Sequence, residues 1–238
     1  MNHTEAAALW EAAEQLAPLV SARLEAVRRR IASAGGDPER IEVVAVTKTF
    51  GPEAVLAAGL AGLEAVGENY AAELVEKAAA VEAAGGKCAW HYLGAVQRNK
   101  VARLVPVVSV WQGIARVVEA EAIAARARKE LPAAFVEVNL GGDPHRPGVP
   151  LDQVGEVVAG VRAAGLDLRG LMAVAPRPES GSDAGEAFGR LAGLAGGLGL
   201  PELSIGMSDD LEAAVRAGST MVRVGRALFG PRDPHTTT

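Results

Sequence analysis

Three observations predict a single-domain α/β protein, a (β/α)8 TIM barrel with an additional N-terminal helix. Short runs of small and β-branched residues alternate with helical stretches, and strict alternation predicts a parallel sheet. Eight such repeats in a chain of 238 residues, 49% of them hydrophobic, fit one closed barrel with a substantial core. No linker rich in Pro, Gly and Ser divides two domains. A doubly wound open sheet is the alternative, because one wrongly assigned strand would open the barrel.

The first expected element is a helix from Thr4 to about Ala34, where apolar residues recur at three- and four-residue steps until two glycines end the pattern. Eight strands are expected at residues 41–48, 63–69, 89–94, 107–112, 133–140, 168–175, 201–208 and 220–225. Helical stretches separate them, among them residues 69–85, 116–131 and 151–165. The loop after the sixth strand is expected at 176–183. The expected divisions are an N-terminal helix packed on the barrel (1–36), the barrel (37–231) and a disordered tail (232–238).

Composition limits the classes of partner. The net charge of −5 offers no basic surface for nucleic acid. The single cysteine, Cys88, excludes an intrachain disulfide framework and a multi-cysteine metal site. The N-terminus lacks a basic start followed by an apolar core, so we expect no secretion signal. No run of about 18 apolar residues suggests a membrane span. We expect a cytoplasmic monomer.

Lys48 ends the first predicted strand, "IEVVAVTK". Side chains alternate along a strand, so Val44, Val46 and Lys48 share one face. If that face points inward, Lys48 lies at the C-terminal mouth of the barrel, where sites of this fold are built. A partly buried amine there suits Schiff-base chemistry. From this stretch alone, a lysine that extends from the barrel rim into water is the more probable alternative.

The last two predicted strands end in candidate phosphate loops. Ser208 stands where a strand passes into a helix, a position that binds anions or that serves as a plain helix cap. Asp209 and Asp210 must turn away if phosphate binds there. Gly225 lets the backbone approach a ligand closely, and the following N–H groups can face a phosphate. Two such loops side by side in a barrel indicate a phosphate site.

Arg223 alternates with two valines in the eighth predicted strand, so its side chain points opposite to theirs. An arginine inside a barrel needs an anionic or polar partner, either a carboxylate or a ligand atom. Lys48, Arg223 and the phosphate loops together fit a ligand with an aldehyde, a ring nitrogen and a phosphate. Pyridoxal 5′-phosphate (PLP) has all three.

Two further polar residues follow or occupy predicted strands. Asn69 comes after the second strand, where capping the next helix is its expected role unless other evidence intervenes. His91 lies within the third strand, and a lone histidine in a strand is usually a satisfied core residue. We assign it no chemical role.

The motifs together resemble the pyridoxal phosphate homeostasis protein family, whose barrel is similar to the N-terminal domain of alanine racemase. The matching stretches are "VAVTKTF", "GENYAAEL", "WHYLGAVQRNK", "GLMAVAP" and "LSIGMSDDLEAAVRAGSTMVRVGRALFG". They run in the family's order from about Ile41 to Gly230. The last stretch is long and specific.

The resemblance implies which residues contact PLP. Lys48 would hold it as a Schiff base, and Arg223 would face the pyridine nitrogen. Asn69 would lie near the ring, and Ser204 is a further possible contact. The residues implied to contact the phosphate are Ser208 and the backbone of Gly225 and Arg226. Where the family usually has a small hydroxyl residue after this glycine, the chain has Arg226.

Three function classes follow. The resemblance implies a non-catalytic PLP-binding protein of intracellular vitamin B6 homeostasis, with PLP-dependent apoenzymes as candidate recipients of the cofactor. The alternatives are an amino-acid racemase of the alanine racemase type and a Schiff-base aldolase-type enzyme.

A racemase needs a second acid/base opposite the lysine. Alanine racemases take theirs from a C-terminal domain that we do not expect here, because the chain ends soon after the eighth strand. An arginine at the ring nitrogen does not give its proton to the pyridine, which also disfavours carbanion chemistry. We expect a carrier or regulator, and weak racemase-like side activity is compatible with this expectation.

Overall fold

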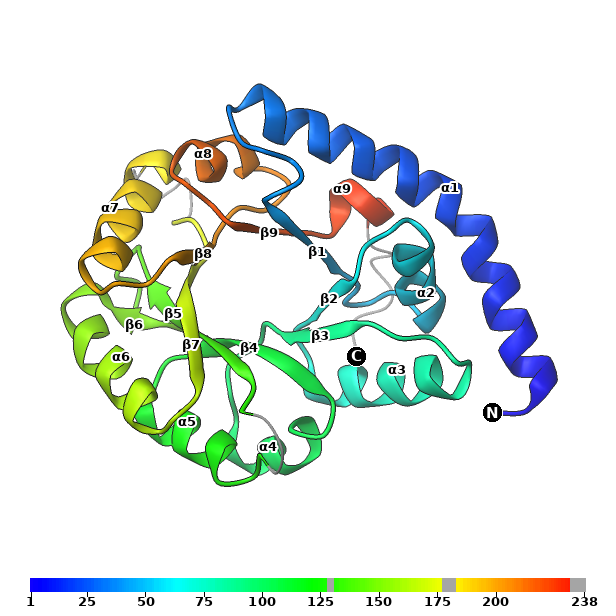
Figure 1. Cartoon of the computed structure of the whole chain (residues 1–238), viewed down its shortest axis with the longest axis horizontal. Coiled ribbons are helices and arrows are strands. Elements are labelled where there is room, and N and C mark those ends of the chain that lie inside the picture. Colours follow the sequence, from blue (N-terminus) through cyan, green and yellow to red (C-terminus); the bar gives the residue numbers. More distant parts are fainter. Residues whose placement is uncertain (128–130, 177–182, 232–238) are drawn as a thin grey trace.

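The computed structural model describes residues 1–127, 131–176 and 183–231, and within them one closed parallel barrel (Figure 1). The strands are β1 (Glu42–Val46), β2 (Ala65–Glu68), β3 (Ala89–Tyr92), β4 (Val108–Ile114), β5 (Ala133–Asn139), β6 (Val149–Pro150), β7 (Asp167–Ala173), β8 (Glu202–Ser204) and β9 (Met221–Val224). Each strand pairs with the next in sequence, except that β5 pairs with both β6 and β7. Pairing of β1 with β9, and of β4 with β5, closes the barrel. The predicted fold is confirmed.

Strand β6 was not predicted. It has two residues and pairs only with the end of β5, through Val138 opposite Val149 and Asn139 opposite Pro150. Two residues carry no alternating pattern, so no signal in the sequence marks this strand. The barrel itself is formed by the other strands of the sheet, which match the eight predicted runs.

Helices surround the barrel. They are α1 (His3–Ser33), α2 (Pro52–Leu60), α3 (Ala71–Ala83), α4 (Arg98–Leu104), α5 (Val117–Ala124), the 3-10 turn η1 (Leu151–Gln153), α6 (Val154–Ala163), α7 (Ala184–Gly197), α8 (Leu211–Arg216) and α9 (Arg226–Phe229). Helix α1 starts at a capping box, in which the side chains of Asn2 and Glu5 each accept the other residue's backbone N–H. It lies outside the helix ring, across α2, α8 and α9 (Figure 1). Most of the predicted loop at 176–183 and the tail at 232–238 lie outside the described residues.

Apolar side chains form two buried clusters, one on each side of the strands. The smaller cluster fills the barrel interior, and its members are Val44, Ala65, Val110, Ala133, Phe135, Met172 and Met221. The larger cluster fills the space between strands and helices and includes Val43 and Ala45. Strand β1 therefore turns Val44 inward and its neighbours outward, as alternation requires.

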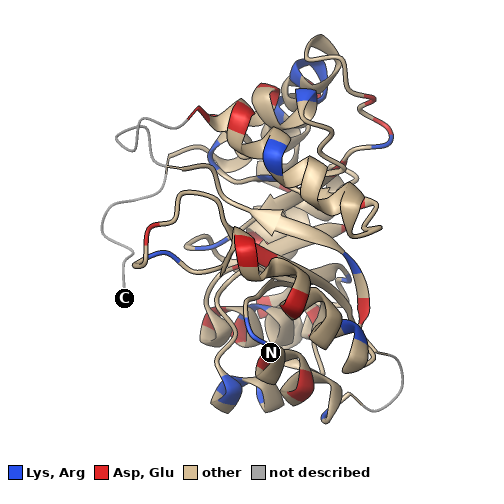
Figure 2. Cartoon of the chain, turned by 90° about the vertical axis from the view of Figure 1, so that its left-hand side faces the viewer, with Lys and Arg blue, Asp and Glu red and all other residues tan. Residues whose placement is uncertain are grey.

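Charged residues of both signs are interspersed over the helices in the view of Figure 2. The formal net charge of −5 comes from 29 acidic and 24 basic residues. No helix in the described part of the chain has the length and apolarity needed to cross a membrane.

Candidate functional site

A cavity of about 510 Å³ opens at the C-terminal ends of the strands, and we call it the upper cavity. Six of the seven residues predicted from sequence line it, and these are Lys48, Asn69, Ser208, Arg223, Gly225 and Arg226. The seventh, Ser204, is fully buried outside the lining. The lining also includes apolar side chains such as Val46, Leu93 and Met172. Residues spread over some 180 positions of sequence thus meet because parallel strands end at one mouth.

Lys48 lies in the turn after β1, since the strand ends at Val46, two residues earlier than the motif predicted. Its neighbours are both held from helix α3. The carbonyl oxygen of Thr47 accepts a 2.7 Å hydrogen bond from Lys77 Nζ, and the backbone N–H of Thr49 donates to Glu73 Oε1 at 2.5 Å. Thr49 has φ +70°, a left-handed conformation unusual for a β-branched residue. Helix α3 therefore fixes the backbone on both sides of Lys48.

An ionic group lies behind this turn, with Glu68 and Lys77 buried and Glu73 partly exposed. The ammonium of Lys77 contacts Glu68 Oε1 at 2.6 Å and Glu73 Oε1 at 2.7 Å, and Glu68 also accepts from the Thr47 hydroxyl at 2.7 Å. The side chain of Glu68 is 0% exposed and that of Lys77 is 6% exposed. Burial raises the pKa of Glu68, and the charge of Lys77 opposes that rise. The sequence did not predict this group, because no local pattern relates Glu68, at the end of a predicted strand, to Glu73 and Lys77 in the following helix.

Arg223 points into the barrel from β9, as predicted. Its Nη1 donates to the Ser204 carbonyl at 2.5 Å and to the Ser204 hydroxyl at 2.7 Å, and its Nη2 donates to the Ala173 carbonyl at 2.8 Å. These contacts fix the plane of the guanidinium at the floor of the upper cavity. Burial lowers the pKa of Arg223 to about 10, with Glu137 opposing the fall. The guanidinium therefore remains protonated at neutral pH.

A chain of hydrogen bonds continues from Arg223 through the barrel interior. The hydroxyl of Ser204 donates to Gln112 Oε1 at 2.6 Å, and Gln112 Nε2 lies 2.8 Å from His91 Nδ1. Burial lowers the pKa of His91 to about 4, so the imidazole is neutral at physiological pH. As the amide lies, Nδ1 accepts and Nε2 carries the proton. Ser204 thus supports Arg223 from behind, and His91 is a hydrogen-bonded interior residue.

The two predicted phosphate loops lie side by side. Ser208 follows β8 by four residues, in a turn ahead of α8, and its hydroxyl accepts the backbone N–H of Ala227 at 3.2 Å. The expectation that Ser208 marks the direct passage from strand to helix is wrong, since the helix starts at Leu211. Gly225 precedes α9, and a Cβ there would lie 3.1 Å from the Val46 carbonyl oxygen. That close approach of two backbones leaves little room for a side chain.

The charged residues of these loops pair with each other. Arg226 forms an ion pair with Asp209, and both side chains are exposed. Asp210 accepts the backbone N–H of Met207 at 2.5 Å. Neither acid lines the upper cavity, which fits the requirement that both turn away from a phosphate.

Asn69 lies in the turn between β2 and α3 and lines the cavity. The alternative expectation that it caps the next helix is wrong, because Tyr70 occupies the N-cap position. A Cβ at Gly94 would lie 2.1 Å from the Asn69 carbonyl oxygen, so this turn packs directly on the one after β3. Glycine at position 94 therefore allows the approach that brings Asn69 to the cavity.

Sequence reasoning missed one charged residue of the lining, Glu137. It lies in β5, and its side chain points inward like that of Phe135, two positions earlier. The residue is 5% exposed, and its Oε2 is buried without a hydrogen-bond partner. Burial raises the pKa of Glu137 to about 7, with Arg223 and Arg146 opposing the rise. An acid on the inward face of an otherwise apolar strand was the available signal.

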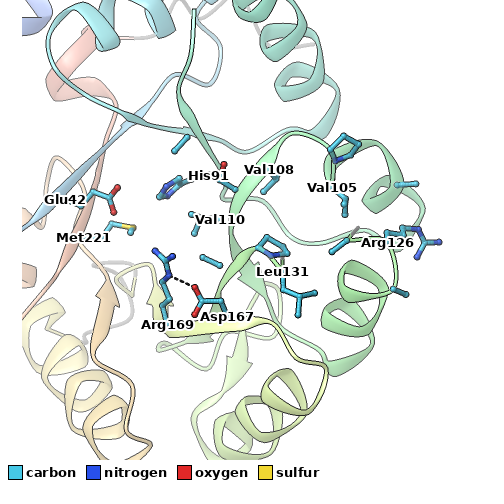
Figure 3. A pocket seen from close by; sticks show the side chains of 18 residues that line it. Glu42, His91, Val105, Val108, Val110, Arg126, Leu131, Asp167, Arg169 and Met221 are labelled. Atoms are coloured by element: carbon cyan, nitrogen blue, oxygen red, sulfur yellow. Dashed lines mark hydrogen bonds and ion pairs between the residues drawn. The ribbon is translucent and has the colours of Figure 1, made fainter. Parts of the chain in front are cut away.

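A larger cavity, of about 1130 Å³, lies at the opposite end of the barrel, where the strands begin. Glu42, His91, Arg169 and Met221 surround it in Figure 3, and Arg169 pairs with Asp167 at 2.9 Å. None of the residues predicted to bind a cofactor lines this lower cavity. The chemistry expected from the sequence therefore belongs to the upper cavity, despite its smaller volume.

Comparison with known proteins places the chain in a family. Residues 21–233 match the family of the alanine racemase N-terminal domain. The pyridoxal phosphate homeostasis protein of Pseudomonas aeruginosa is 38% identical over 217 residues, which cover 87% of this chain and 91% of the relative. The chain belongs to the pyridoxal phosphate homeostasis protein family. The predicted resemblance is confirmed.

Solved structures agree with this family membership. PipY of Synechococcus elongatus, determined with PLP bound, superposes on this family member with a TM-score of 0.73 and 27% identity, over 86% of this chain and 100% of PipY. Alanine racemase of Corynebacterium glutamicum shares the fold, with a TM-score of 0.65 and 18% identity. The superposition covers 90% of this chain and 61% of the racemase.

Proposed function

We propose that this chain binds PLP in the upper cavity, as a Schiff base on Lys48, and takes part in PLP homeostasis in the cytoplasm without catalysing a reaction. The observation that carries the proposal is the set of groups lining one cavity: a lysine amine, an inward arginine, and two loops suited to phosphate. The family membership and the PLP bound to PipY support the choice of cofactor.

Each residue has a stated part in the proposed binding. Lys48 would hold PLP through its amine, as a Schiff base with the aldehyde carbon and with release of water. Arg223, held by Ser204 and Ala173, faces the ring nitrogen. Ser208 and the backbone at Gly225 and Arg226 receive the phosphate. Asn69 contacts the ring. The turn that helix α3 holds in place orients the lysine. We assign Ser204 the role of holding Arg223, and not a direct contact with PLP.

Two features favour a carrier over a racemase. Arg223 keeps its proton at neutral pH, so a ring nitrogen beside it stays unprotonated and the cofactor is a poor electron sink. Neither tyrosine of the chain lines the upper cavity: Tyr70 is exposed, and the Tyr92 hydroxyl donates to the Ala95 carbonyl at 3.4 Å. We propose that PLP-dependent apoenzymes receive the cofactor and that the chain acts as a monomer.

The test is an absorbance spectrum of the purified protein after incubation with PLP, before and after borohydride. Wild-type protein is expected to show a band near about 420 nm that borohydride removes, with the reduced adduct on Lys48. Lys48→Ala is expected to lack the band, and Lys87→Ala, at an exposed lysine, is expected to keep it. A folded wild-type protein without the band, or an adduct elsewhere, would refute the proposal. Racemisation of L-alanine no faster than with free PLP is expected, and faster turnover would favour the enzyme alternative.

A further inference from the structure

Glu137 is the one acidic residue among the described residues that line the upper cavity. The other charged members of the lining are the cations Lys48, Arg223 and Arg226. A cavity with this charge suits an anion, and a single carboxyl group within it is the exception that needs a physical account.

The carboxyl group is poorly satisfied by the protein. Its Oε2 is buried and has no hydrogen-bond partner, and the whole residue is only 5% exposed. A buried polar atom without a partner is costly and rare, so either a bound proton or a ligand atom is expected to satisfy it. Glu137 lines the upper cavity, of about 510 Å³, and a small cavity of about 40 Å³ beside it, so the upper cavity is the one with room to bring a ligand atom to the carboxyl group.

The charges around Glu137 are engaged elsewhere. Arg223 donates to Ser204 and Ala173, and Arg146 donates to the Ala175 carbonyl at 2.8 Å. Glu119, whose negative charge adds to the rise in the pKa of Glu137, pairs with Arg116 at the start of α5. The remaining cations of the lining are Lys48, after β1, and Arg226, which pairs with Asp209. Among the described residues, the hydrogen bonds and ion pairs of Arg223, Arg146 and Arg226 thus go to groups other than Glu137.

We propose that the protonation state of Glu137 sets how tightly the upper cavity holds its anionic cofactor. This inference rests on the proposed function. A neutral carboxyl adds no charge and can donate a hydrogen bond, whereas a carboxylate repels a phosphate-bearing ligand. Binding therefore favours protonated Glu137, and the wild-type protein holds the cofactor less tightly as the pH rises. The pKa near 7 puts the change in the physiological range.

The test compares PLP binding by the wild type and by Glu137→Gln from pH 6 to 8.5. Glutamine keeps the size and polarity of the side chain but does not titrate. The ratio of the wild-type Kd to the variant Kd cancels the titrations of Lys48 and of the phosphate, which both proteins share. If binding raises the pKa of Glu137 by about one unit, the ratio is expected to rise roughly sevenfold over this range.

The matched control is Glu202→Gln, at the opposite end of the barrel, where burial also raises the pKa of the carboxyl group. The ratio of the wild-type Kd to the Glu202→Gln Kd is expected to stay constant with pH. A constant ratio for Glu137→Gln as well, with measurable PLP binding, would overturn this inference and leave the proposed function intact. No PLP binding by the folded wild type at any pH would instead refute the proposed function.

A second measurement avoids dependence on the variant's folding. Infrared difference spectra of the wild type at pH 8, with and without PLP, are expected to gain the C=O stretch of a protonated carboxylic acid. The same spectra of Glu202→Gln are expected to show the same gain, because its Glu137 is intact. The absence of this band from both proteins at saturating PLP would also overturn the inference.

Discussion

The buried ionic group beside Lys48 allows a quantitative test by replacing Lys77 with methionine. Methionine fills a similar volume but removes the ammonium that contacts Glu68 at 2.6 Å, Glu73 at 2.7 Å and the Thr47 carbonyl at 2.7 Å. The side chain of Glu68 is 0% exposed, so the variant leaves a buried carboxylate without its cation. Removal of one partner from a buried pair typically costs about 3–5 kcal/mol. We expect Lys77→Met to lose that much free energy of unfolding at pH 7.

The assay is urea unfolding followed by circular dichroism, with Lys87→Met as the control. Lys87 is exposed, and its replacement is expected to change the free energy of unfolding by no more than about 0.5 kcal/mol. The combined variant Lys77→Met/Glu68→Gln removes the orphaned charge as well, so it is expected to recover part of the loss. Equal losses in the two methionine variants, or no recovery in the combined variant, would refute the reasoning.

The pH dependence gives the sign of the same effect. Burial already raises the pKa of Glu68 in the folded protein, and loss of the Lys77 charge raises it further. A carboxyl group whose pKa is higher when folded binds its proton more tightly in the folded state, so folding gains stability as the pH falls. The cost of Lys77→Met is therefore expected to shrink between pH 7 and pH 5.

Three further outcomes are expected. Ser204→Ala leaves its two buried hydrogen-bond partners short of one bond each and is expected to cost about 1–3 kcal/mol in urea unfolding, whereas Ser109→Ala, at an exposed position, changes little. Gly170→Ala puts a Cβ 2.0 Å from a backbone oxygen of β8 and is expected to destabilise by about 1–3 kcal/mol, while Gly189→Ala, with open space on its helix, is expected to gain about 0.5–1 kcal/mol. The Cys88 thiol, whose pKa burial raises to about 12, is expected to react with Ellman's reagent far more slowly at pH 8 in native protein than in urea. Equal rates would contradict that burial.

The alternation of residue types along the chain predicted the fold and much of the site. Alternation along "VVAVTK" predicted that Val44 and Lys48 share a face, and the structure puts Val44 inside the barrel. Alternation also predicted the inward direction of Arg223. Both predictions depend only on strand geometry, which the chain carries locally.

The remaining features depend on contacts between distant segments. Lys77 and Glu68 are nine positions apart, and no pattern shows that a helix residue reaches under a strand end to hold the turn that carries Lys48. Ser204 was predicted as a ligand contact, but the register of β8 against β9 puts it behind Arg223. Strands β1 and β8 also end before the predicted strands do. A strand ends where its hydrogen bonds to the neighbouring strand end, and these depend on the sequences of both segments.

The line of hydrogen bonds from His91 to Arg223 connects the two mouths of the barrel. Along it Arg223 Nη1 donates to the Ser204 hydroxyl oxygen, the Ser204 hydroxyl donates to Gln112 Oε1, and Gln112 Nε2 donates to His91 Nδ1. A proton added at Nδ1 of His91 would put two donors face to face, and the amide of Gln112 would have to turn over. Its nitrogen would then face the Ser204 oxygen, and the seryl hydrogen would lose its acceptor. One proton on His91, beside the lower cavity, would thus reorient polar groups all the way to Arg223 at the upper cavity.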